Sequence, residues 1–95
     1  MKTKPGQLAR FRIGKIYTTP NAMECLTTED ILLAIGRHQS GDWGDVDEHD
    51  RQANQRALVE RTRLLSVYRS VNGIKFWIIT EADRSSTTIL LPQDY

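Results

Sequence analysis

The segment of residues 80–88, TEADRSSTT, holds the densest set of groups that could do chemistry. Glu81 and Arg84 could act as an acid–base group and a phosphate clamp, provided that the fold brings a histidine beside them. The hydroxyls around Arg84 could also hold an anion. The same residue types build ordinary β-turns, in which Asp83 and Ser85 bond their own backbone. We favour the turn and keep the anion site as the alternative.

Carboxylates, a histidine and a tryptophan gather in residues 41–50, GDWGDVDEHD. Carboxylate oxygens this close together could bind a divalent cation, but the spacing matches neither an EF-hand calcium loop nor a two-histidine zinc site. Acids at the start of a helix explain the same pattern by capping. We therefore predict neither a metal nor another cofactor. Trp43, between two glycines, either covers the core or is displayed for stacking against a partner.

The first part of the chain is basic and carries aromatic residues between its charges. Arg10 and Arg12 flank Phe11, Tyr17 follows, and no acid occurs before Glu24. Such a pattern can follow a phosphate backbone and stack bases. An edge strand with one solvated basic face gives the same pattern, and we favour that interpretation. The net charge of +1 selects neither a nucleic acid nor an acidic partner.

The length and composition indicate one globular domain. A chain of 95 residues with 39% hydrophobic and 26% charged residues fits a single domain over 1–95, of which we expect 1–6 to be flexible. No apolar run approaches the roughly eighteen residues of a membrane-spanning helix, and no secretory signal follows the basic start. The single cysteine, Cys25, allows no internal disulfide, so we expect a cytoplasmic protein without a membrane partner.

Capping signals predict two helices. Thr27 is a good N-cap with Asp30 three residues later, and Gly36 is expected to end the helix that begins there. Asp45 is expected to cap the second helix. The Thr-Pro pair at 19–20 predicts a turn or a short helix, because proline suits the first helical position.

Alternating and β-branched runs predict about four strands. The first covers residues 8–18, and residues 64–92 indicate a three-stranded meander. The Asn-Gly pair at 72–73 predicts a two-residue type I′ hairpin, whose register would place Tyr68 opposite Trp77. The order β-α-α-β-β-β favours an α+β fold, in which two helices pack on one face of an antiparallel sheet.

Several segments of the chain resemble a known family. The most specific are GDWGD at 41–45 and WIITEADRS at 77–85, and shorter matches extend over nearly the whole chain. In these segments the protein resembles a family of small uncharacterised bacterial proteins that are often encoded on plasmids and other mobile elements. The resemblance implies no established activity. It implies that the two segments act together, most simply by forming one cleft at one end of the sheet.

The leading hypothesis is a non-enzymatic binding module of an accessory or mobile genetic element that contacts a protein or a nucleic acid. The predicted binding residues are Asp42, Trp43, Glu81, Asp83, Arg84, Ser85 and Thr87, with Arg10 and Arg12 as outlying contacts. The alternative is a small barnase-like nuclease or toxin-type enzyme that uses Glu81, Arg84 and His38. A third possibility is a homodimer in which an exposed edge strand pairs with its copy.

Overall fold

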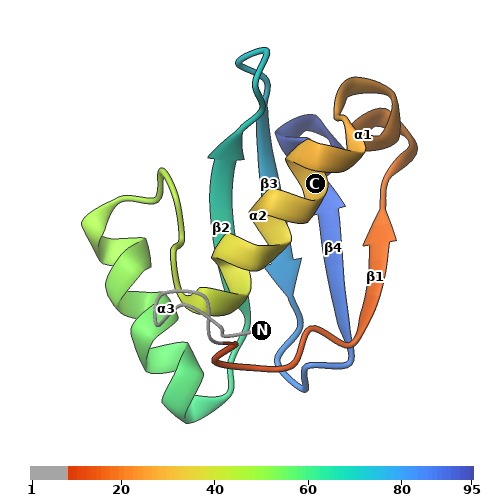
Figure 1. Ribbon diagram of the computed structural model, residues 1–95. Coiled ribbons are helices and arrows are strands. Elements are labelled where there is room, and N and C mark those ends of the chain that lie inside the picture. Colours follow the sequence, from red (N-terminus) through yellow and green to blue (C-terminus); the bar gives the residue numbers. More distant parts are fainter. Residues whose placement is uncertain (1–8) are drawn as a thin grey trace, which may run out of the picture.

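The computed structural model describes residues 9–95 and shows one sheet with helices on one side (Figure 1). The predicted flexible segment 1–6 lies outside the described residues. The elements in chain order are β1 (Lys15–Thr18), α1 (Pro20–Cys25), α2 (Thr28–Ser40), α3 (Glu48–Glu60), β2 (Leu64–Arg69), β3 (Lys75–Thr80), β4 (Ser86–Leu90) and the 3-10 turn η2 (Pro92–Asp94). The predicted α+β class and the four strands are confirmed. Within the described part of the chain, no helix has the length and apolar character needed to cross a membrane.

The helix starts follow their predicted capping residues at two of three places. Thr19 caps α1 and Pro20 takes its first position. Thr27 caps α2 in a full capping box with Asp30, whose carboxylate accepts the Thr27 N–H at 3.1 Å. Asp45 was the wrong cap for α3, because Asp47 accepts the backbone N–H of the third helical residue at 2.8 Å instead.

The predicted end of α2 at Gly36 is wrong. The helix continues to Ser40 and ends at Gly41, which has a left-handed φ of 88°. A glycine inside a helix costs only about 1 kcal/mol relative to alanine. The extra turn buries the side chain of His38 completely, and its tertiary contacts offset that cost.

The sheet has the strand order β1-β4-β3-β2 and is mixed rather than purely antiparallel. The β2, β3 and β4 strands form the predicted antiparallel meander. The first strand, however, pairs with β4 in parallel, with Lys15 opposite Ser86. The helices carry the chain from β1 across to β2, and the meander then returns to β1 with its third strand running in the same direction (Figure 1).

The β2–β3 hairpin has a three-residue loop, so the predicted type I′ turn is wrong. The Ser70 N–H donates to the Ile74 carbonyl at 2.9 Å, and the Gly73 N–H donates to the Ser70 carbonyl at 2.9 Å. Within this loop, only Gly73 has a positive φ, 82°, whereas a type I′ turn needs two such residues. The register is therefore shifted by one residue, so Tyr68 lies opposite Phe76 rather than Trp77.

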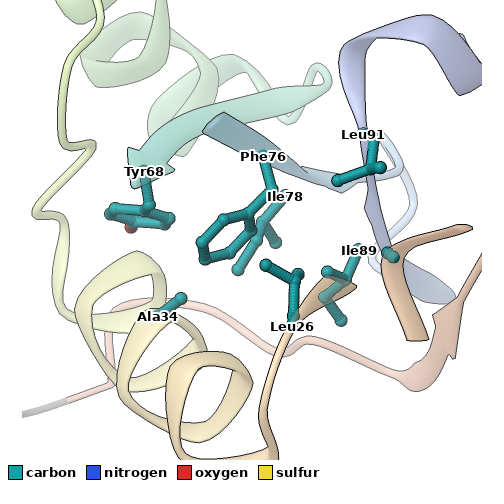
Figure 2. Close-up of a cluster of buried hydrophobic side chains, with 8 residues drawn as sticks. Leu26, Ala34, Tyr68, Phe76, Ile78, Ile89 and Leu91 are labelled. Atoms are coloured by element: carbon teal, nitrogen blue, oxygen red, sulfur yellow. The ribbon is translucent and has the colours of Figure 1, made fainter. Parts of the chain in front are cut away.

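The main core lies between α2 and the sheet (Figure 2). Its buried residues are Ala22, Leu26, Ala34, Tyr68, Phe76, Ile78, Ile89 and Leu91. A second cluster joins α3 to the start of β2 through Trp43, Ala57 and Leu64. Leu64 shares its face of β2 with Tyr68, because alternate strand residues point to the same side. The two longer helices thus cover the same face, as predicted.

Candidate functional site

The β3–β4 connection is the tight turn that the sequence favoured. The Glu81 N–H donates to the Ser86 carbonyl at 3.0 Å, and the Arg84 N–H donates back to the Glu81 carbonyl at 2.9 Å. The Asp83 carboxylate accepts the Ser85 N–H at 3.0 Å. Arg84 closes the turn with a left-handed φ of 62°. This conformation turns the Arg84 side chain away from solvent.

The Arg84 guanidinium is a structural clamp inside the protein. The residue is only 7% exposed. Its terminal nitrogens donate to the carbonyls of Ala57 at 2.9 Å and Thr62 at 2.7 Å, and to two carbonyls of its own turn. Carbonyls at a helix C-terminus have no partner within the helix and carry partial negative charge. Arg84 therefore ties the end of α3 to the β3–β4 turn.

The two segments of the family resemblance meet through Phe11, which is half-buried. Trp43 is 3% exposed and stacks on Phe11, with ring centroids 6.2 Å apart and an interplanar angle of 23°. The guanidinium carbon of Arg84 lies 5.7 Å from the centroid of the same ring. Trp43 is thus a core residue and not a surface for stacking against a partner. The contact between the two segments is therefore packed side chains rather than the expected cleft.

The segment around Trp43 also covers one edge of the sheet. The Val67 N–H donates to the Trp43 carbonyl at 3.0 Å, and the Asp45 N–H donates to the Val67 carbonyl at 2.7 Å. Gly44 must be glycine, because a Cβ there would lie 2.0 Å from the Val67 oxygen and its φ is 73°. The Asp42 carboxylate accepts two bonds from Arg37, at 2.8 and 3.2 Å. The acids of 41–50 thus have local structural partners.

His38 lies at the centre of a buried hydrogen-bond chain that determines its tautomer. The Thr87 hydroxyl donates to the Ile13 carbonyl at 2.7 Å, so Thr80 must donate to Thr87 across their 2.7 Å contact. Thr80 then has only lone pairs left for the His38 Nε2, 2.8 Å away, which must therefore carry the proton. Nδ1 accepts from the Ser66 hydroxyl at 2.6 Å. Burial lowers the pKa of His38 to about 3, so the ring is neutral.

Each group of the nuclease hypothesis is bound by its own partners. His38 is 0% exposed and both of its nitrogens are occupied. The Glu81 carboxylate accepts from Arg63 at 3.3 Å. The Arg84 guanidinium is engaged by four backbone carbonyls. His38 and Arg84 have no free group for a substrate, and the partly exposed Glu81 is paired with Arg63, so the geometry gives the nuclease hypothesis no support.

The predicted binding residues divide by exposure. Trp43, Arg84 and Thr87 are buried, Glu81 is half-buried, and Asp42, Asp83 and Ser85 are exposed. The exposed His49 and the acids Asp47 and Asp50 have potential ligand atoms within 4.8 Å of one another. Asp47 is already the cap of α3, so this acidic group is explained by the helix start.

A basic cavity of about 450 Å³ opens beside the Arg84 turn. Four arginines line it: Arg10, Arg12, Arg61 and Arg84. Among the described residues, Asp83 is the one acid in the lining, and Phe11 and Leu58 contribute apolar surface. The arginines come from three separate segments, namely the stretch before β1, the end of α3 and the β3–β4 turn.

The segment before β1 is held in place by the end of α2. The Arg10 N–H donates to the Gln39 carbonyl at 2.8 Å, and the Gln39 side chain donates to the Phe11 carbonyl at 3.0 Å. The Arg10 Nε also donates to the Ser40 carbonyl at 2.9 Å. This anchoring replaces most of the predicted 8–18 strand, which within the described residues is reduced to Lys15–Thr18. It also directs the two basic side chains of this segment to the cavity.

The charges of the cavity are poorly neutralised by the protein. Among residues 9–95, no salt bridge involves Arg10, Arg12 or Arg61. Burial, together with the nearby charge of Arg61, lowers the pKa of Arg84. Guanidinium groups arranged around one cavity in this way favour a phosphate or another multivalent anion. The sequence signal for this site was the acid-free stretch before Glu24, whereas nothing in the sequence analysis pointed to Arg61.

Comparisons of the chain with protein-family models, with curated proteins and with solved structures find no match. The resemblance to a plasmid-encoded family therefore stays a prediction. The functional argument depends on the site alone.

Proposed function

We propose that the protein is a small non-catalytic module that binds a nucleic acid by its phosphates at the arginine cavity. The observation that supports this most directly is the convergence of Arg10, Arg12, Arg61 and Arg84 on one cavity, whose lining holds a single acid within residues 9–95. Phosphate contacts supply most of the affinity in sequence-independent nucleic-acid binding. Arginine suits this role because its planar guanidinium can make two parallel bonds to one phosphate.

The four arginines have different roles in this proposal. Arg10, Arg12 and Arg61 are exposed and form no salt bridge within residues 9–95, so their guanidinium groups can reach a ligand. Arg84 is held by carbonyls and contributes its positive charge rather than a flexible contact. A buried fixed charge acts in a medium of lower effective dielectric than water, where its attraction for an anion is stronger.

Base stacking is not part of the proposed mode. One face of the Phe11 ring lies against Trp43, and the ring also contacts the Arg84 guanidinium. Stacking on single-stranded bases requires an aromatic face that is open to the ligand. Binding should therefore depend on phosphate charge and show little preference for base sequence. We keep the cytoplasm of a bacterial cell, and an accessory or mobile genetic element, as the proposed setting for this module.

The proposal is tested by fluorescence anisotropy with labelled single- and double-stranded DNA and RNA of about 20 nucleotides, starting near 50 mM salt. Arg12→Gln and Arg61→Gln should each weaken binding several-fold and reduce the slope of log K against log salt by roughly 0.7–0.9. Arg56→Gln is the matched control, because Arg56 is an exposed arginine of α3 that does not line the cavity. It should leave affinity and slope unchanged.

Three outcomes would count against this function. No binding to any of these nucleic acids at low salt would overturn it and direct the search to a protein partner. An equal loss with Arg56→Gln would show that diffuse surface charge, and not the cavity, carries the binding. Cleavage of the labelled strands, followed on a gel, would contradict the non-catalytic assignment and revive the nuclease alternative.

A further inference from the structure

One edge of the sheet is covered by another part of the chain and the other edge is not covered by any described segment. The outer edge of β2 is covered by the chain itself, through the bonds between Val67 and the Trp43–Asp45 segment. The outer edge of β1 has no described segment beside it (Figure 1). Uncovered strand edges are templates for pairing with another chain, and proteins usually block them with charges, prolines or bulges.

The backbone bonds of β1 show which groups face outward. The Lys15 N–H donates to the Ser85 carbonyl and the Thr19 N–H to the Ile89 carbonyl, both at 3.0 Å, so these groups point towards β4. Backbone groups alternate in direction along a strand, which places the N–H and C=O groups of Ile16 and Thr18 on the outer edge. This edge holds no proline, and Lys15 is the one charged residue of the strand.

The side chains beside these groups are apolar and exposed. Ile16 is 47% exposed and Tyr17 is 53% exposed. Tyr17 shares its side of the sheet with Thr88, its parallel partner in β4, on the face that α2 does not cover. An edge with free backbone groups and uncovered apolar side chains has the properties of an interface between strands.

We infer that β1 pairs with β1 of a second copy of the chain, antiparallel and about a two-fold axis at Tyr17. Ile16 of each copy then faces Thr18 of the other, and both residues have outward backbone groups, so the pairing forms four hydrogen bonds. The two Tyr17 rings meet at the axis in a pair without backbone bonds, where Cβ atoms lie about 5 Å apart. Lys15 faces Thr19 of the other copy, so no like charges meet.

The self-complementarity of this register is the reason for choosing a second copy over a foreign strand. About this axis, each outward N–H meets a C=O of the symmetry mate. The exposed side chains of Ile16 and Tyr17 meet Thr18 and Tyr17 of the other copy, as a two-fold interface requires. Pairing extends the sheet to eight strands. Because β1 has only four residues, the contact is small and we expect a weak dimer, with a dissociation constant on the order of 100 µM.

Sedimentation equilibrium on the full chain, from about 10 µM to about 1 mM, tests the dimer. The wild-type mass should rise towards twice the monomer mass, and Tyr17→Lys should stay monomeric because two ammonium groups would meet at the axis. Val59→Lys is the matched control, since Val59 is 84% exposed on α3, away from β1, and it should dimerise like the wild type. A wild type that is monomeric throughout would overturn the inference.

A charge-swap experiment separates self-pairing from general surface association. Tyr17→Glu alone should also be monomeric, whereas an equimolar mixture of Tyr17→Glu and Tyr17→Lys should form the mixed dimer. Failure of the mixture to associate while the wild type dimerises would place the interface elsewhere and refute the β1 pairing. Circular dichroism confirms that each variant is folded. The inference is independent of the proposed nucleic-acid binding, which the arginine variants test separately.

Discussion

Acidification should destabilise the protein through His38 well before its carboxylates are protonated. Burial, and next the charge of Arg84, lowers the pKa of His38 from 6.5 to about 3 in the folded protein. Between these two pH values, His38 is protonated in the unfolded chain and neutral in the folded protein. The stability due to neutral His38 is therefore complete above about pH 6.5 and is lost as the pH falls towards about 3. The limiting slope is about 1.4 kcal/mol per pH unit, which gives a loss of about 2 kcal/mol between pH 7 and 5.

Urea unfolding followed by tryptophan fluorescence at about pH 7 and about pH 5 measures this loss as a change in the free energy of unfolding. His49→Gln is the matched control, because the His49 side chain is 86% exposed and its removal should leave the difference unchanged. NMR titration of the wild type should show no protonation of His38 above about pH 4. Equal stabilities at the two pH values, or a His38 ring that titrates near 6.5, would refute the buried neutral histidine.

Two further predictions concern stability, measured by chemical denaturation. Gly44→Ala should destabilise the fold by more than about 3 kcal/mol, because its Cβ would clash with backbone, whereas Gly36→Ala should stabilise it by about 0.5–1 kcal/mol, since nothing lies within 4 Å of the new methyl. A stabilised Gly44→Ala would contradict the edge packing. Arg84→Gln should cost about 2–4 kcal/mol, because the charge-assisted bonds from Arg84 to the Ala57 and Thr62 carbonyls are lost. Arg61→Gln, at an exposed position, should cost little, and equal effects of the two changes would contradict the clamp.

Local signals in the sequence predicted the helix starts well and the helix ends poorly. The Thr27 capping box depends on residues three positions apart, so it can be read directly. The extension of α2 past Gly36 depends on the contacts of His38 with Ser66 and Thr80, which are distant in sequence. In the same way, several acids in 41–50 could cap α3, and the packing of this segment on β2 decides among them.

The sequence predicted the pairing of strands that follow one another along the chain. The meander follows from three β-rich runs joined by turns, although the loop of three residues rather than two shifted its register. The parallel pairing of β1 with β4 joins residues such as Lys15 and Ser86, which have no local signal in common. Its consequence is large, because it leaves β1 at one edge of the sheet and creates the surface to which we assign dimerisation.

The polar residues of the β3–β4 turn show why the candidate site could not be read from residue types alone. The same turn sequence is compatible with an arginine that faces solvent or the interior. The side chain of Arg84 points inward because it bonds to a carbonyl at the end of α3, which is distant in sequence. Because Arg84 is both a cavity residue and a clamp, replacing it would disturb the fold and the cavity together. Loss of nucleic-acid binding in an Arg84 variant would therefore not locate the site. Arg12 and Arg61 are exposed, and their side chains make no hydrogen bond or salt bridge within residues 9–95, so binding and folding can be separated at these positions.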